Sequence, residues 1–461
     1  MRNIAIFIIA LFMAGCSFRP AMPETNTTFE YKYESSDIND YWWKEFNDER
    51  LNALVEDALK NNIDLKLAYI NLQKAALTLK NSKADLFPTV GINAEASKTR
   101  TSGETYTGQD NIKYDSFSLN AVLNYEVDLW GRVRNSIASS DALLQASKYD
   151  YANSRLTIAS NVAQAYFTLV SLRMQERVLE DTLASYIDTM NYRKKQLDAG
   201  SITQMVYLQS VASVQSAQIS LTDVKNSIVS ASNSLAILCA KSNDEILNQI
   251  VATSATLPDA PQVNAGISSD ILLRRSDVAS AYESLKSSNA LIGVAKAAYF
   301  PTLSLTGIFG FSSSELDRLF VQNANVWSLA GSLAQTVFDY GKRRNNVEIA
   351  KFTQSANALS YEKTIKTALG EVKVALEDRK NAMQVWQDTK RLLSSQDEIY
   401  HLAKAQYDAG YSDHLTFLDA QRNLLSTRLS AISAQLNLDN AAVEIYKVFG
   451  GGVKAEQTEQ K

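Results

Sequence analysis

This 461-residue chain contains two histidines and two cysteines, residue types whose side chains often bind metals or act in catalysis. His401 and His414 have no other metal ligands near them at the spacing of a metal-binding motif, so no metal site is expected and both are predicted to be surface or capping residues. The sequence also contains no phosphate-binding loop, no nucleotide-binding glycine cluster and no nucleophile motif. These observations disfavour an enzyme.

Cys16 follows a segment that is typical of an export signal. Arg2 supplies a positive charge, Ile4 to Phe12 are apolar, and Met13-Ala14-Gly15-Cys16 resembles the cleavage site of a bacterial lipoprotein. We therefore expect residues 1–15 to be a signal peptide and Cys16 to carry a covalent lipid, with no other cofactor. The alternative is an ordinary signal peptide followed by an incidental cysteine. Lipidation would leave Cys239 without a disulfide partner, as a buried and inert thiol.

Two regions alternate between apolar and polar residues, the pattern of a strand with one apolar face. They predict β-hairpins at about 88–129 and 301–338, the latter including Val337. No stretch of about 18 apolar residues occurs after the signal segment, so the sequence predicts no helix that spans a membrane. The hairpins therefore favour transmembrane β-structure, with two soluble hairpins packed on helices as the alternative. The polar face of the first hairpin would line a wet lumen with Ser118, Asn120, Asn124 and Glu126.

The two hairpin regions belong to an internal tandem repeat. Pro301 lies 213 positions after Pro88 in similar surroundings. Gly341 lies 210 positions after Gly131, and Gly410 lies 210 positions after Gly200. We therefore divide the chain after the signal peptide into a lipidated N-terminal segment, a first repeat, a linker, a second repeat and a tail. Their ranges are 16–45, 46–251, 252–266, 267–449 and 450–461.

Each repeat is expected to contain a helix, its hairpin, a long helix and a return helix. The chain has only 17 Gly and 6 Pro, so it offers few places to turn. Apolar residues spaced alternately four and three apart predict long coiled-coil helices over residues 132–198 and 342–408. Gly200 and Gly410 stand where these helices would end and the chain would turn back.

The membrane part must be built from more than one chain. An open sheet edge leaves backbone groups unsatisfied in lipid, and about eight strands are the practical minimum for closure. Four strands therefore require at least two chains, and the helices would continue the lumen as an α-helical tube. A nucleic-acid partner is not expected, because the formal net charge is −4 and no basic block occurs.

The sequence resembles the outer-membrane factors, the TolC/OprM-like exit ducts of tripartite efflux pumps. The resemblance covers essentially the whole mature sequence, including Tyr41-Trp42-Trp43, Leu273-Arg274-Arg275, Ala298-Tyr299-Phe300-Pro301, Leu418-Asp419-Ala420-Gln421-Arg422 and Gly450-Gly451-Gly452. It implies a mixed α+β membrane protein that forms a homotrimer. A 12-stranded outer-membrane β-barrel, four strands per chain, would continue into a long periplasmic coiled-coil barrel. The implied partners are a periplasmic adaptor, an inner-membrane RND transporter and outer-membrane lipid.

The resemblance also implies functional residues at the periplasmic tip. Leu415, Asp419 and Arg422 share one helical face at i, i+4, i+7 spacing and would form the gate. An exposed Asp419–Arg422 pair of little consequence is the alternative. The turns at Gly200-Ser201-Ile202-Thr203 and Gly410-Tyr411-Ser412-Asp413 are candidate adaptor-docking sites.

The function implied is passive exit of drugs and other small toxic compounds across the outer membrane. A duct for type I protein secretion is the alternative, and a structural coiled-coil protein is disfavoured by the paired hairpins. Asn26 lies in an Asn-x-Thr sequence, a short motif that occurs often by chance and is a weak candidate for glycosylation.

Overall fold

The computed structural model describes residues 17–23, 38–102, 112–251, 256–261 and 275–453. Contacts between residues divide the chain into two compact units. The first unit comprises residues 1–28, 71–148 and 280–362, and the second comprises 29–70, 149–279 and 363–461.

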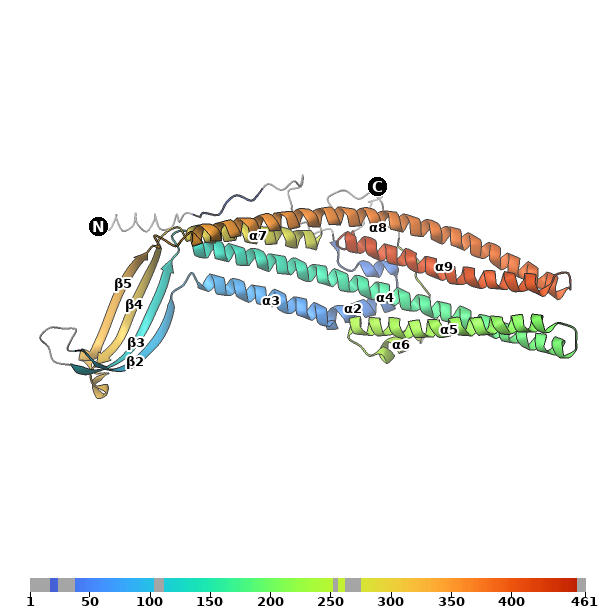
Figure 1. Cartoon of the computed structure of the whole chain (residues 1–461), viewed down its shortest axis with the longest axis horizontal. Coiled ribbons are helices and arrows are strands. Elements are labelled where there is room, and N and C mark those ends of the chain that lie inside the picture. Colours follow the sequence, from blue (N-terminus) through green and yellow to red (C-terminus); the bar gives the residue numbers. More distant parts are fainter. Residues whose placement is uncertain (1–16, 24–37, 103–111, 252–255, 262–274, 454–461) are drawn as a thin grey trace, which may run out of the picture. The chain divides into compact units, whose positions relative to one another are not determined.

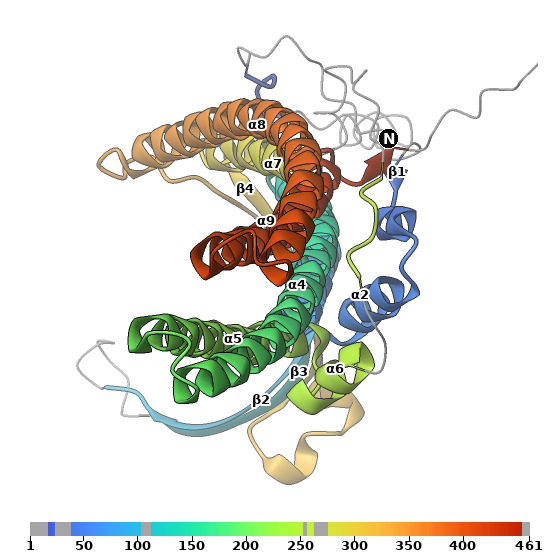
Figure 2. The ribbon, with the colours of Figure 1, turned by 90° about the vertical axis from the view of Figure 1, so that its right-hand side faces the viewer.

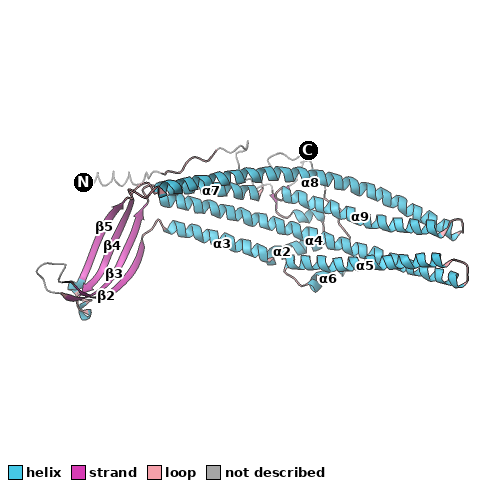
Figure 3. Ribbon diagram, in the orientation of Figure 1, coloured by secondary structure: helices cyan, strands magenta, loops and turns pink. Residues whose placement is uncertain are grey.

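The first unit contains a four-stranded antiparallel sheet (Figures 1 and 3). Its strands are β2 (Thr89–Arg100), β3 (Lys113–Val127), β4 (Thr302–Ser313) and β5 (Asn325–Ala334), in that spatial order. The second hairpin therefore extends the sheet of the first, because β3 pairs with β4. Two single 3₁₀ turns, Leu316–Arg318 and Gln322–Ala324, connect β4 to β5.

The second hairpin is shorter than the alternating pattern predicted. β5 ends at Ala334, so Val337 lies outside the strand. The reason is its partner: Thr302, the first residue of β4, pairs with Ala334, and the preceding Pro301 has no N–H to extend the ladder. Gln335 instead donates its side-chain amide to the carbonyl of Tyr299 at 3.0 Å.

Two helices of 67 residues follow the hairpins, α4 (Arg132–Asp198) and α8 (Lys342–Asp408). Their bounds coincide with the ranges expected from the sequence. The chain returns along them through α5 (Gln204–Cys239) and α9 (His414–Val448) (Figures 1 and 2). Cross-helix ion pairs join each antiparallel pair, Lys225 to Glu180 in the first and Arg428 to Asp397 in the second.

The return path differs between the two halves. In the second half α9 is continuous, whereas α5 ends at Cys239 because Ala240 adopts the left-handed conformation, with φ of 53°. A short helix, α6 (Asn243–Val251), follows this break. The single return helix expected for the first half is therefore two helices.

The largest apolar core lies in the second unit. It joins a 3₁₀ turn at Trp42–Phe46 and helix α2 (Glu49–Asn61) to buried faces of α4, α5 and α9. Trp42 stacks on Tyr446 with ring centroids 5.1 Å apart, and Phe46 contacts Phe167. Close to this core, β1 (Ile38–Asn39) pairs with β6 (Gly452–Val453), which ties together segments from the two ends of the described chain.

Small polar residues join the helices of the first unit. α3 (Ile63–Ala84) contacts α4 through the hydroxyls of Ser82 and Ser140, 2.8 Å apart. α7 (Ser276–Ala297) contacts α4 through Ser287 and Ser139, also 2.8 Å apart. Among the described residues, no helix is long and apolar enough to cross a membrane.

Candidate functional site

Polar residues form rows across one face of the sheet. The register places Asn120 between Asn93 and Gly310, and Ser118 between Glu95 and Ser312. Asn124 and Glu126 lie in the same alternation, beside Thr306 and Ser304 respectively. All four residues predicted to line a lumen, Ser118, Asn120, Asn124 and Glu126, therefore share one face with polar or small residues of the neighbouring strands.

The opposite face of the sheet is apolar and exposed. Ile92, Phe309, Trp327 and Leu329 have 81%, 60%, 75% and 77% of their surface exposed. The register aligns Ile92, Ala121, Phe309 and Trp327 in one row. An exposed apolar face of this extent on a sheet with a polar opposite face is suited to contact with lipid.

An ion pair lies at the end of the polar face where β3 leads into α4. Arg132 donates two hydrogen bonds to the carboxylate of Glu126, at 2.8 and 2.9 Å. Just beyond it, the carboxylate of Asp128 accepts hydrogen bonds from the backbone N–H groups of Val133 and Arg134 and so caps the start of α4. Glu126, one of the predicted lumen residues, is thus held by a bidentate pair.

The two candidate docking turns have the same backbone geometry. Gly200 and Gly410 adopt φ of 71° and 80°, and each N–H donates to the carbonyl three positions earlier. The next N–H, of Ser201 or Tyr411, donates to the carbonyl of Gln196 or Gln406, which completes a Schellman motif. Both turns present mainly exposed residues, with Tyr411 89% exposed.

The three candidate gate residues lie on one exposed face of α9. Leu415 is 51% exposed, and Asp419 and Arg422 are also exposed. Arg422 donates to the hydroxyl of Ser213 on α5 at 3.0 Å. Within the described part of the chain, Asp419 and Arg422 form no ion pair with each other. Arg422 therefore links α9 to another helix instead of stabilising its own.

A group of contacts near these turns was not predicted from the sequence. Arg193 of α4 is only 4% exposed, and it donates hydrogen bonds to the hydroxyl of Tyr407 on α8 and, at 2.6 Å, to the side chain of Gln196. Its guanidinium also lies 5.0 Å from the centre of the Tyr407 ring. Tyr407 stacks on Phe417 of α9 at 5.2 Å. These contacts join the two helix pairs of the second unit.

His414 belongs to the same group and departs from expectation. A lone histidine of this kind was predicted to be a surface or capping residue, yet it is half-buried beside the Tyr407 ring. Burial first, and then the charges of Arg193 and Arg422, lower the pKa of His414 to about 4. The imidazole is therefore neutral at neutral pH. His401, by contrast, is exposed and lies 3.5 Å from Asp397.

The lipidation candidate Cys16 and the glycosylation candidate Asn26 lie outside the described residues. Two positions after Cys16, Phe18 stacks on Phe300 with ring centroids 4.4 Å apart, and Phe300 in turn stacks on Trp130. Cys239 is fully buried, and burial raises the pKa of its thiol to about 11. That environment keeps the thiol protonated and unreactive.

The sheet with one polar and one apolar face, and the helix ends beside the turns at Gly200 and Gly410, here called the tip, belong to a chain that is similar to known proteins. A model of the family described as outer membrane efflux protein matches residues 54–240 and 267–451. The toluene efflux pump outer membrane protein TtgC of Pseudomonas putida is 30% identical, over 97% of this chain and 95% of its own length. The cation efflux system protein CusC of Escherichia coli K12 is 29% identical, over 97% and 98%.

A solved structure agrees with the sequence comparison. The CmeC outer membrane channel of Campylobacter jejuni superposes with a TM-score of 0.86 at 31% identity, covering 97% of this chain and 96% of its own. The similarity includes both hairpins and both long helices, because it spans nearly the whole of each chain. The chain belongs to the outer membrane efflux protein family.

Proposed function

We propose that three copies of this chain form a passive exit duct for small toxic compounds. A periplasmic adaptor and an inner-membrane RND transporter would deliver the compounds, and energy would be supplied by the transporter alone. The relatives support this class of cargo, since TtgC is named for toluene efflux and CusC for cation efflux. This chain would supply the route across the outer membrane and no catalytic step.

The observation that carries the proposal is a four-stranded sheet with an exposed apolar face and two free edges. β2 and β5 each pair with only one strand of the described chain. In lipid, every backbone N–H and C=O group needs a partner, so these edges must pair with other chains. Three chains of four strands would close a barrel of twelve, with Ser118, Asn120, Asn124 and Glu126 facing its lumen.

The helices support a tube that continues from the barrel. Both hairpins lead directly into helices of equal length, which return at matching glycine turns. We attribute this correspondence to duplication of one ancestral half. The exposed turns at residues 200–203 and 410–413 would dock the adaptor. A lipid on Cys16 would anchor the assembly to the outer membrane.

A deletion strain tests the function. Removing this chain should increase susceptibility to several unrelated drugs, and re-expression of the wild-type chain should restore resistance. Secreted proteins should remain at their normal level in the culture medium. Unchanged drug susceptibility would refute the efflux assignment, and a specific loss of a secreted protein would instead favour the type I secretion duct.

A further inference from the structure

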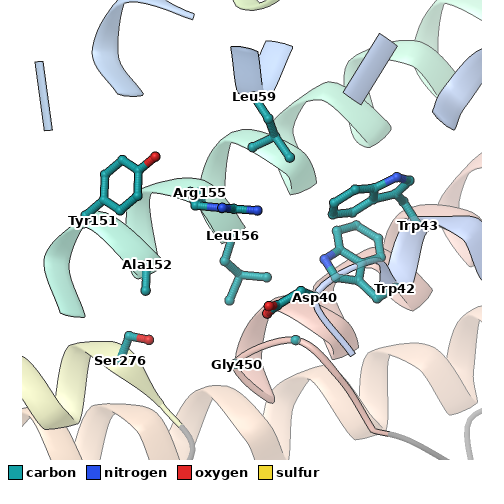
Figure 4. Close-up of a pocket in the computed structure, with 11 residues that line it drawn as sticks. Asp40, Trp42, Trp43, Leu59, Tyr151, Ala152, Arg155, Leu156, Ser276 and Gly450 are labelled. Atoms are coloured by element: carbon teal, nitrogen blue, oxygen red, sulfur yellow. The ribbon is translucent and has the colours of Figure 1, made fainter. Parts of the chain in front are cut away.

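A cavity of about 230 Å³ in the second unit has a chemistry that channel function does not explain (Figure 4). It lies among the Trp42–Phe46 turn, α2, α4, the start of α7 and the glycines that follow α9. The residues that define its chemistry are Asp40, Trp42, Leu59, Arg155, Leu156 and Ser276.

Hydrogen-bond donors without acceptors line this cavity. Trp42 is only 1% exposed, and its indole Nε1–H has no hydrogen-bond partner among the described residues. Arg155 forms no hydrogen bond or ion pair within the described part of the chain. Figure 4 shows its guanidinium pointing across the cavity towards Trp43 and Trp42, and the nitrogen of Trp42 is on the ring edge that faces the cavity. A buried donor left without an acceptor destabilises the fold, so a bound acceptor would be favourable.

The start of α7 adds to the same electrostatic preference. Ser276 is the first residue of this 22-residue helix and is 9% exposed where it lines the cavity. The N-terminus of a helix carries a partial positive charge. At α7 the carboxylate of Asp277 in the first turn accepts the N–H of Val278 and offsets a part of it. Together with the charge of Arg155, the remaining partial charge favours an anion in the cavity.

The remaining walls restrict which anion fits. Leu59 and Leu156 supply apolar surface, as does the ring of Tyr151. The exposed Asp40 places one negative charge at the cavity, which opposes the attraction of Arg155 and disfavours a doubly charged ligand about twice as strongly as a singly charged one. We propose that this cavity binds a small organic monocarboxylate, which accepts hydrogen bonds from Trp42 and Arg155 and places its apolar part against Leu59 and Leu156. This binding is separate from transport through the duct and does not depend on it.

Isothermal titration calorimetry, with benzoate titrated into the full-length protein in detergent, tests the proposal. Wild type should show saturable binding. Arg155→Gln and Trp42→Phe should each weaken it at least about tenfold, because each removes one hydrogen bond to the carboxylate, and that of Arg155 is also charge-assisted. Lys148→Gln is the matched control, since it removes one positive charge from an exposed position of the same helix. It should leave the affinity unchanged.

Two further measurements make the test decisive. Inorganic phosphate should bind more weakly than benzoate in wild type, and Asp40→Asn should reduce this difference. Benzoate should also raise the melting temperature of wild type and of Lys148→Gln, because a ligand that binds only the folded state stabilises it. A lack of saturable benzoate binding to wild type overturns the proposal. Equal binding by correctly folded Arg155→Gln and Trp42→Phe does the same.

Discussion

Among single residues, Asp439 is an acidic side chain whose surroundings oppose its negative charge. It is fully buried on α9, and neither carboxylate oxygen accepts a hydrogen bond in the described structure. Burial first, and then the nearby charge of Asp259, raise the pKa of Asp439 to about 8, although Arg379 opposes the shift. The protonated form is therefore favoured in the folded protein well above the pH at which an exposed carboxyl ionises, about 4.

This raised pKa makes the stability of the second unit depend on pH. Because the folded state holds the proton more tightly than the unfolded chain, the contribution of Asp439 is fully present below about pH 4. It is lost as the pH rises through about 8. Asp439→Asn should therefore raise the melting temperature by an amount that grows from pH 5 to pH 9. The free energy regained at pH 9 should be on the order of a few kcal/mol.

Melting curves of wild type and variant at pH 5, 7 and 9 measure this effect. Asp223→Asn, which changes an exposed acid on α5, should leave the melting temperature nearly unchanged at each pH. A difference between Asp439→Asn and wild type that stays constant with pH would show that Asp439 is ionised throughout.

The candidate gate residues can be tested by conductance. Arg422→Gln weakens the bond to Ser213 that joins α9 to α5, and Asp419→Asn removes a charge from the same exposed face. We expect each substitution to increase single-channel conductance in planar bilayers, by loosening the tip or by changing its charge. Arg428→Gln, which loses an α8–α9 ion pair instead, is the matched control. Wild-type conductance in both gate variants would reject the gate assignment.

Among the elements, each turn between long helices contains a glycine in the left-handed conformation. No heavy atom of the described residues would lie within 4 Å of a Cβ added at Gly410, so within this part of the chain its φ of 80° is what opposes another residue. Gly410→Ala should cost about 1–2 kcal/mol, because L-residues are strained in the left-handed region. Gly370, inside α8, is equally open but lacks the positive φ, so Gly370→Ala should stabilise the helix by about 0.5–1 kcal/mol.

Opposite shifts in melting temperature for these two variants would confirm that the turn requires a glycine. A neutral Gly410→Ala would mean that the turn can adopt another geometry at no cost. The same substitution at Gly200 provides an independent repeat of the measurement, because that glycine is equally open.

The bounds of these elements could be predicted, whereas the contacts between them could not. Periodicity and glycine positions are local signals, and they located both 67-residue helices. The link from Arg193 to Tyr407 joins residues 214 positions apart, and the link from Arg422 to Ser213 joins residues 209 apart. Neither pair leaves a pattern in one sequence. The half-burial of His414 was missed for the same reason, since its neighbours come from other helices.

For the whole molecule, the main feature that needs a partner is the exposed apolar face of the sheet. Alternation alone predicted which residues share a face, because a strand places successive side chains on opposite sides. It did not predict that β5 would end at Ala334, since that limit is set by pairing with Thr302. The proposed assembly places Leu329 against lipid and Ser328 towards the lumen, on adjacent positions of one strand.

These neighbours allow a matched test of the barrel. Leu329→Lys would place a charge in the hydrocarbon, at a cost of about 2–4 kcal/mol near the bilayer centre, whereas Ser328→Lys would place it in water. Leu329→Lys should therefore reduce the amount of assembled protein recovered from the outer membrane, and Ser328→Lys should not. Mass measurement in detergent should show a trimer for wild type and for Ser328→Lys. A wild-type monomer, or normal assembly of Leu329→Lys, would contradict a trimeric barrel whose apolar face contacts lipid.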